Sequence, residues 1–257
     1  MNNVIGALQR QQDELSGLVS TLQGAGLARP SRCPGWSVSD VLLHLAQTNE
    51  LAIASTQGRL RELSEHFVGG FDSIVTVDEW AAKVVERERG SAAEAIRDRW
   101  LESAHAQLAA FRACDPHARV QWVAGEMSAR SLATTRLAET WIHTVDVAWG
   151  LNVELRATER LWHIARLAWR TLPYAFARAG RHLTGPVSFE LRGPNGEMWR
   201  FAGNEMVTAS DARETIIRGA AIDLCTVAGQ RAHAADTPLT ADGPDAEAVL
   251  TLVRTFA

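Results

Sequence analysis

The stretch MSARSLATTRLAETWIHTVDVAWGL (127–151) decides the fold, because it has the pattern of one long helix with two unlike faces. At 100° per residue, apolar side chains cover most of its circumference: Leu137, Ala138, Trp141, Ile142, Val145 and Trp149. The remaining stripe is charged and contains Arg136, Glu139, His143 and Asp146. Ser128 is a suitable N-cap, and Gly150 predicts the end of helix 129–149. A helix this apolar has to pack against others, so it predicts a helical bundle.

Helical spacing of apolar residues continues on both sides of this stretch, from residue 3 to about residue 179. We expect further helices over 3–24, 38–56, 77–88, 91–113 and 156–179. Ser37, with Asp40 three residues later, predicts the start of helix 38–56. One face of that helix carries Val38, Val41, Leu42, Leu45 and Asn49. The segments 67–75 and 119–127 predict a flexible link and an extended stretch.

After Gly185 the periodicity changes from helical to alternating. The segments VSFELRG (187–193) and EMWRFAG (197–203) flank a Pro-Asn-Gly turn, which predicts a β-hairpin. Residues 214–219 predict a third strand, and 220–230 and 244–256 predict two helices. The chain is therefore expected to be mainly α, with an up-down four-helix bundle over residues 1–182 and a small α+β domain over 183–257.

The composition and net charge of the chain indicate which classes of partner to expect. The chain has 257 residues, 46% of them hydrophobic and 22% charged, with a net charge of −4. This balance predicts neither nucleic acid nor an anionic membrane as partner, and no apolar run reaches the ~18 residues of a membrane span. The N-terminus lacks a signal-peptide pattern, and the three cysteines are widely spaced. We expect a cytoplasmic protein that acts on a small molecule, and the sequence leaves its oligomeric state open.

The charged stripe contains a candidate metal-binding pair. Glu139 and His143 are four residues apart, so their side chains lie one turn above the other and can bind one ion. The alternative interpretation is a solvated face with a ladder of salt bridges. His44 lies on the polar flank of helix 38–56, with Ser37 and Gln47. On its own, such a histidine is an ordinary surface residue.

The segment RCPGWSVSDVLLHLA (32–46) resembles the signature of the mycothiol-dependent maleylpyruvate isomerase family, a branch of the DinB-like metalloenzymes of actinobacteria. The segment 127–151 resembles the metal-binding helix of that family. The resemblance implies that His44, Glu139 and His143 bind a divalent metal, usually zinc. It covers residues 1 to about 180 and extends weakly to IIRGAAIDLCTVAGQR (216–231), which is similar to the family's sterol-carrier-like C-terminal domain.

Three protein ligands leave a position open on the ion, which is typical of catalytic sites. Two neutral imidazoles and one carboxylate leave a charge near +1 on a divalent ion, which stabilises a thiolate, hydroxide or enolate. The resemblance implies that mycothiol binds as the thiolate and adds to an activated double bond. Rotation and loss of the thiol then isomerise the substrate, and a retained adduct makes the protein a thiol transferase. The alternatives are a thiol-independent metal-dependent isomerase, cyclase or hydrolase of a biosynthetic pathway, and an inactive binding module.

Three further residues are candidates for catalysis. Asp146 is placed to accept the second ring N–H of a ligand histidine, or else to cap a neighbouring helix or pair with Arg136. Arg136 either orients Glu139, binds a substrate carboxylate or forms a structural ion pair. For Arg231 the resemblance implies a contact with an anion, as a catalytic and cofactor-binding residue, with Arg218 as the second choice.

Cys33 precedes Pro34 in the first motif, and we interpret it as a packing residue without a role in catalysis. Trp36 and Trp141 are interpreted as core aromatics. A site of two histidines and one carboxylate does not separate zinc from nickel, manganese or iron.

Overall fold

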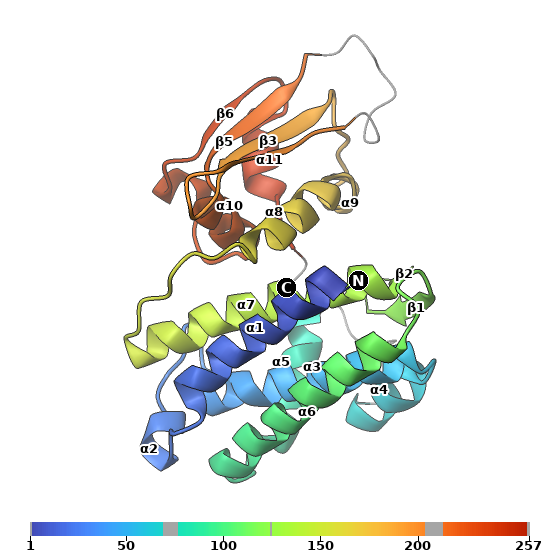
Figure 1. Cartoon of the computed structure of the whole chain (residues 1–257), viewed down its shortest axis with the longest axis vertical. Coiled ribbons are helices and arrows are strands. Elements are labelled where there is room, and N and C mark those ends of the chain that lie inside the picture. The colour runs from blue at the N-terminus through green and yellow to red at the C-terminus, as the bar shows by residue number, and fades with distance from the viewer. Residues whose placement is uncertain (1, 69–76, 124, 204–212, 256–257) are drawn as a thin grey trace. The chain divides into compact units, whose positions relative to one another are not determined.

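The computed structural model describes residues 2–68, 77–123, 125–203 and 213–255. The chain divides into two compact units, Met1–Leu155 and Arg156–Ala257, which are drawn in Figure 1. Most of the link predicted at 67–75 lies outside the described residues. Within the described ranges, no helix combines the length and the apolarity that crossing a membrane requires.

Four long helices form the first unit, as Figure 1 shows: α1 (Asn2–Val19), α3 (Val38–Thr56), α6 (Ala93–Ala113) and α7 (Ala129–Leu151). Each packs on two of the others, in the cyclic order α1, α7, α3, α6. Their shared core is apolar and fully or almost fully buried, and includes Leu15, Val19, Leu42, Leu45, Trp100, Ala104 and Val147. The predicted four-helix bundle is confirmed.

Shorter elements complete this unit. They are α2 (Gly24–Leu27), α4 (Leu60–Val68), α5 (Val77–Glu88), β1 (Arg119–Trp122) and β2 (Gly125–Ser128). Helices α4 and α5 both pack on α3. Strands β1 and β2 pair antiparallel, with Arg119 opposite Ser128, in the segment predicted to be extended.

The ends of the two helices that carry the predicted ligands show why they begin and end where they do. Asp40 N donates to Ser37 Oγ at 3.1 Å and Ser37 N donates to Asp40 Oδ2 at 2.8 Å, which completes the predicted capping box at the start of α3. The predicted end of α7 at Gly150 is wrong, because the helix continues to Leu151 and Asn152 follows with φ 57°. Gly150 is needed for another reason: a Cβ there would lie 2.3 Å from the carbonyl oxygen of Pro30.

The second unit contains a four-stranded sheet with the strand order β4-β3-β5-β6. Its strands are β3 (Val187–Arg192), β4 (Met198–Phe201), β5 (Thr215–Ala220) and β6 (Thr240–Asp242). Strands β3 and β5 run parallel, and the other two pairs are antiparallel. The helices of this unit are α8 (Leu161–Arg170), α9 (Leu172–Arg178), α10 (Ala221–Ala228) and α11 (Ala246–Leu252), with a short 3₁₀ turn at Ala234–Asp236. The predicted hairpin, third strand and small α+β unit are confirmed.

The single helix predicted over 156–179 is wrong, since the chain forms two helices there that meet at Thr171. Pro173 lies in the first turn of α9, where its missing N–H is tolerated, but it prevents α8 from continuing. Helix α8 packs on α10 and β4, and Trp169 Nε1 donates to Val187 O at 2.8 Å. Both helices therefore belong to the compact unit of the sheet, so the units divide after Leu155 and not at 182, where the bundle was predicted to end.

Candidate metal centre

The three side chains predicted to bind a metal lie together inside the bundle. His44 comes from α3, and Glu139 and His143 come from successive turns of α7. His44 Nε2 is 3.0 Å from Glu139 Oε1, and the two imidazole rings meet edge to face with centroids 4.9 Å apart. One ligand atom from each of the three residues lies within 4.8 Å of the other two. All three are buried, with 8–9% of each residue exposed, so the stripe is not the solvated face of the alternative interpretation. The salt bridges of that alternative are present as the buried pairs Arg136–Glu139 and His143–Asp146.

The donor set fits a divalent cation. Nitrogen and oxygen ligands lie about 2.0–2.2 Å from zinc, so two of them on a tetrahedral ion are about 3.3–3.6 Å apart. The separation of 3.0 Å between His44 Nε2 and Glu139 Oε1 is only a few tenths of an ångström shorter. A cation can therefore replace the shared proton with a small movement of the two side chains.

The protonation states also suit a metal. Burial lowers the pKa of His44 below its usual value, and this outweighs the opposing effect of its hydrogen bond with Glu139. Burial on its own would raise the pKa of Glu139, but Arg136 and His44 beside it lower that pKa well below its ordinary range. At neutral pH the centre consequently offers a neutral imidazole and a charged carboxylate, the forms that bind a cation.

Arg136 is fully buried and contacts the second oxygen of the glutamate. Its Nη1 donates to Glu139 Oε2, while Nη2 donates to Thr48 Oγ1 at 2.9 Å and to Asn49 Oδ1 at 3.2 Å. Among the roles considered from the sequence, this arrangement favours orientation of Glu139. Glu139 Oε1 is left facing His44.

A chain of buried polar side chains extends from Arg136 across the bundle. Asn49 Oδ1 also accepts from Gln107 Nε2 at 2.8 Å, and Asn49 Nδ2 donates to Ser103 Oγ at 3.2 Å. Gln12 Nε2 donates to Gln107 Oε1 at 3.1 Å, so the chain reaches all four long helices. Sequence reasoning missed this network because it placed Asn49 on an apolar face. The available signal was a pair of polar residues, 48 and 49, a little more than one turn beyond His44.

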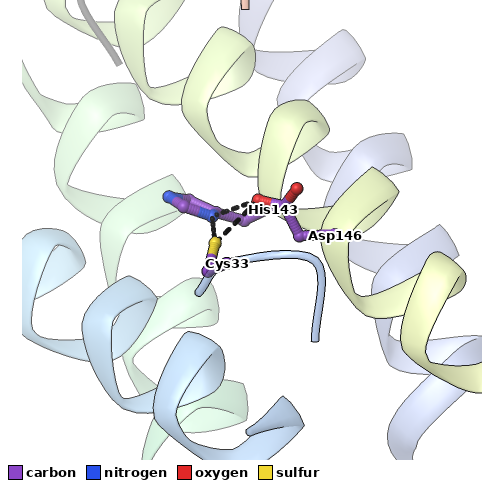
Figure 2. Close-up of side chains that lie close together, drawn as sticks. All are labelled: Cys33, His143 and Asp146. Carbon is purple, nitrogen blue, oxygen red and sulfur yellow. Dashed lines mark hydrogen bonds and ion pairs between the residues drawn. The ribbon is translucent and has the colours of Figure 1, made fainter. Parts of the chain in front are cut away.

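Asp146 lies beside His143, about one turn further along α7. Asp146 Oδ2 is 3.0 Å from His143 Nδ1, so the predicted contact with the second ring nitrogen is present and the alternative pairing with Arg136 is replaced by the pair Arg136–Glu139. Cys33 Sγ is 3.1 Å from the same carboxylate oxygen and 3.9 Å from His143 Nδ1 (Figure 2). The interpretation of Cys33 as a packing residue missed this polar contact.

The two arginines predicted as anion contacts, Arg231 and Arg218, belong to the second unit. Arg231 follows α10, is half-buried, and donates from Nη1 to Gly229 O at 3.0 Å. Arg218 lies on β5, and its Nε donates to Glu190 Oε2 at 2.8 Å. Arg218 is thus held in an ion pair on the sheet.

The first unit is a four-helix bundle of the DinB-like kind, with a buried His–Glu–His cluster between two of its helices. The family model of the mycothiol maleylpyruvate isomerase N-terminal domain matches residues 8–148, and the chain belongs to this family. Two uncharacterized proteins of Mycobacterium tuberculosis, from strains CDC 1551 and H37Rv, are each 32% identical to it over 265 residues, covering 98% of this chain and 95% of theirs.

Two crystal structures share the fold of the whole chain. They are structures of the mycothiol-dependent maleylpyruvate isomerase, one of them of an alanine mutant. Each matches with a TM-score of 0.62 and covers 95% of both chains, at 16% sequence identity. The likeness therefore includes the small α+β unit as well as the bundle.

Proposed function

We propose that this chain is a metal-dependent enzyme in which His44, Glu139 and His143 hold one divalent ion, with zinc as the expected metal. The observation that carries the proposal is the convergence of three ligand atoms from α3 and α7 within 4.8 Å in a buried position. Burying a carboxylate and two imidazoles in an apolar bundle is costly unless they are paired or bind a cation. Arg136 and Asp146 add one positive and one negative charge, so together they leave the net charge of the centre unchanged.

The charge balance favours an anionic ligand. A divalent ion with two neutral imidazoles and the Glu139 carboxylate has a net charge near +1, because the charges of Arg136 and Asp146 cancel. When bound, such an ion supplies a positive charge that stabilises a thiolate at neutral pH. A low-molecular-weight thiol is therefore a suitable co-substrate, and membership of the family favours mycothiol.

Other residues of the chain orient the metal ligands and bind the anionic group of the thiol or substrate. Arg136 occupies Glu139 Oε2, which leaves Oε1 as the oxygen offered to the metal. Asp146 accepts the hydrogen of His143 Nδ1, so the lone pair of that ring lies on Nε2. Arg231 is proposed as the contact for an anionic group of the thiol or substrate, which rests on the family resemblance and on its half-buried position after α10.

The reaction proposed is reversible addition of the thiol to a small unsaturated or carbonyl compound. The sulfur forms a bond to one carbon of the activated double bond while the other carbon takes up a proton. Rotation about the new single bond, loss of that proton and departure of the thiolate return an isomerised double bond. If the adduct is released instead, the same addition makes a thiol transferase.

The test is to incubate the metal-loaded protein with mycothiol and maleylpyruvate, and to follow isomerisation and thiol concentration together. We expect isomerisation that requires mycothiol and disappears in His44→Ala. His105→Ala is the matched control, since His105 is exposed on α6, and it should keep full activity. Turnover of an electrophile without any thiol would instead support the thiol-independent metalloenzyme. Absence of thiol binding and of turnover over a panel of electrophiles would support the inactive binding module.

A further inference from the structure

A short loop before α3 contacts both histidines of the candidate metal centre. In the loop Ser31–Trp36, Ser31 N donates to Trp36 O at 2.9 Å, and Cys33 N donates to Ser31 Oγ at 3.1 Å. The Trp36 ring lies against His44 with centroids 5.4 Å apart, and Cys33 Sγ lies 3.9 Å from His143 Nδ1. The loop is therefore part of the wall of the centre.

The loop is also fixed to α7. Arg32 N donates to the backbone carbonyl of Asp146 at 3.1 Å. The backbone at Pro30 approaches Gly150 so closely that only glycine fits. Gly35 has φ 76°, a conformation that glycine adopts without strain and that closes the turn. These constraints hold the Cys33 side chain in one place relative to α7.

The sulfur of Cys33 and the ring of His143 share one oxygen. Asp146 is 0% exposed, and its Oδ2 lies 3.1 Å from Cys33 Sγ and 3.0 Å from His143 Nδ1. A charged carboxylate only accepts, so both hydrogens come from its partners: one from the thiol and one from the ring. Figure 2 shows the sulfur and the carboxylate on one side of the ring, with its other nitrogen pointing away from them.

We propose that Cys33 is a positioning residue for the candidate metal centre. Its thiol donates to Asp146 Oδ2 and thereby holds the carboxylate against His143 Nδ1, which keeps Nε2 of His143 free of a proton and turned away from Asp146. A buried carboxylate that loses a donor takes up a different rotamer or admits water to replace it. The ring of His143 then loses its fixed tautomer and orientation. The consequence for metal binding rests on the proposed function, whereas the consequence for the ring does not.

The first measurement uses metal-free protein. In ¹⁵N–¹H spectra of the histidine side chains, His143 should show an Nδ1–H resonance that exchanges slowly with water. Cys33→Ser keeps a donor and should preserve the resonance and its exchange rate within about twofold. Cys33→Ala removes the donor and should speed exchange by about threefold or more. Cys114→Ala is the matched control, because Cys114 is a half-buried cysteine whose thiol contacts only the neighbouring carbonyl of Asp115 in the described contacts.

The second measurement is zinc affinity, by competition with a chelator. Loss of a carboxylate partner of a ligand histidine typically weakens metal binding by 10–100-fold, and Asp146→Ala should fall in this range. Cys33 acts one contact further out, so Cys33→Ala should weaken zinc binding by about three- to tenfold, with Cys33→Ser and Cys114→Ala close to the wild type.

The two measurements separate the two proposals. An unchanged Nδ1–H exchange rate in Cys33→Ala would overturn the positioning role, whatever the metal affinity is. Faster exchange in a protein that binds no zinc in any form would confirm the positioning of the ring and overturn the proposed metal centre. Equally faster exchange, or an equal loss of zinc affinity, in Cys33→Ser and Cys33→Ala would show that the sulfur acts by its size and not as a donor, and this too would overturn the proposal.

Discussion

Replacing Arg136 by methionine removes a buried positive charge and leaves Glu139 without its cationic partner. Arg136 is 0% exposed, and its terminal nitrogens contact Glu139, Thr48 and Asn49. Removing one member of a buried ion pair costs about 3–5 kcal/mol, because the other charge stays buried. We therefore expect Arg136→Met to lower the free energy of unfolding of the metal-free protein by this amount.

The assay is urea unfolding followed by the helical circular dichroism signal. With a slope of about 2 kcal/mol per molar urea, the midpoint should fall by about 1.5–2.5 M. The matched control is Arg119→Met, because Arg119 pairs with Glu126 at the surface with 60% of its side chain exposed. Loss of such a pair costs at most about 1 kcal/mol. A shift for Arg136→Met no larger than that of Arg119→Met would refute the reasoning.

The other predictions concern the loop contact and the pH dependence of metal binding. Gly150→Ala should lower the free energy of unfolding by about 1–3 kcal/mol, because its Cβ would lie 2.3 Å from Pro30 O. Gly17→Ala, in α1 with nothing within 4 Å of the added Cβ, should raise it by about 0.5–1 kcal/mol in the same urea unfolding assay. An equal change in the two variants would contradict this, because it would show that the backbone at Pro30 moves away from the added methyl group. Because burial lowers the pKa of His44 below 6.5, a metal competes with no proton there at neutral pH. Protonation of His44 should therefore weaken metal affinity only in buffer more acidic than about pH 6.5. A His44 ring that takes up its proton above pH 7 in an NMR titration of the metal-free protein would contradict this sign.

The sequence was sufficient for the parts of the fold that depend on local patterns. The capping box of Ser37 and Asp40 predicted the start of α3, and the alternation around Pro-Asn-Gly predicted the pairing of β3 with β4. At least three predictions of helix ends failed, one of them for the helix expected over 3–24, which ends at Val19. Gly150 was taken as a helix end when its role is the close approach of Pro30, and the two helices beside Thr171 were taken as one.

For the candidate site, helical spacing brought Glu139 and His143 together, while only the resemblance added His44. Sequence alone could not tell that the charged stripe of α7 is buried, since burial depends on which helices cover it. The same limit applies to Cys33 and Asn49. Cys33 meets Asp146 across 113 positions of the sequence, and Asn49 meets Arg136 across 87. No local pattern encodes contacts of that range.

The most direct test of the central claim is the amount of metal bound per chain after dialysis against zinc and then against metal-free buffer. We expect about one equivalent in the wild type and in His105→Ala, and less than about a tenth in His44→Ala and in His143→Ala, with helical content unchanged. A full equivalent in either of the two ligand variants, or less than a tenth in the wild type, would contradict the account.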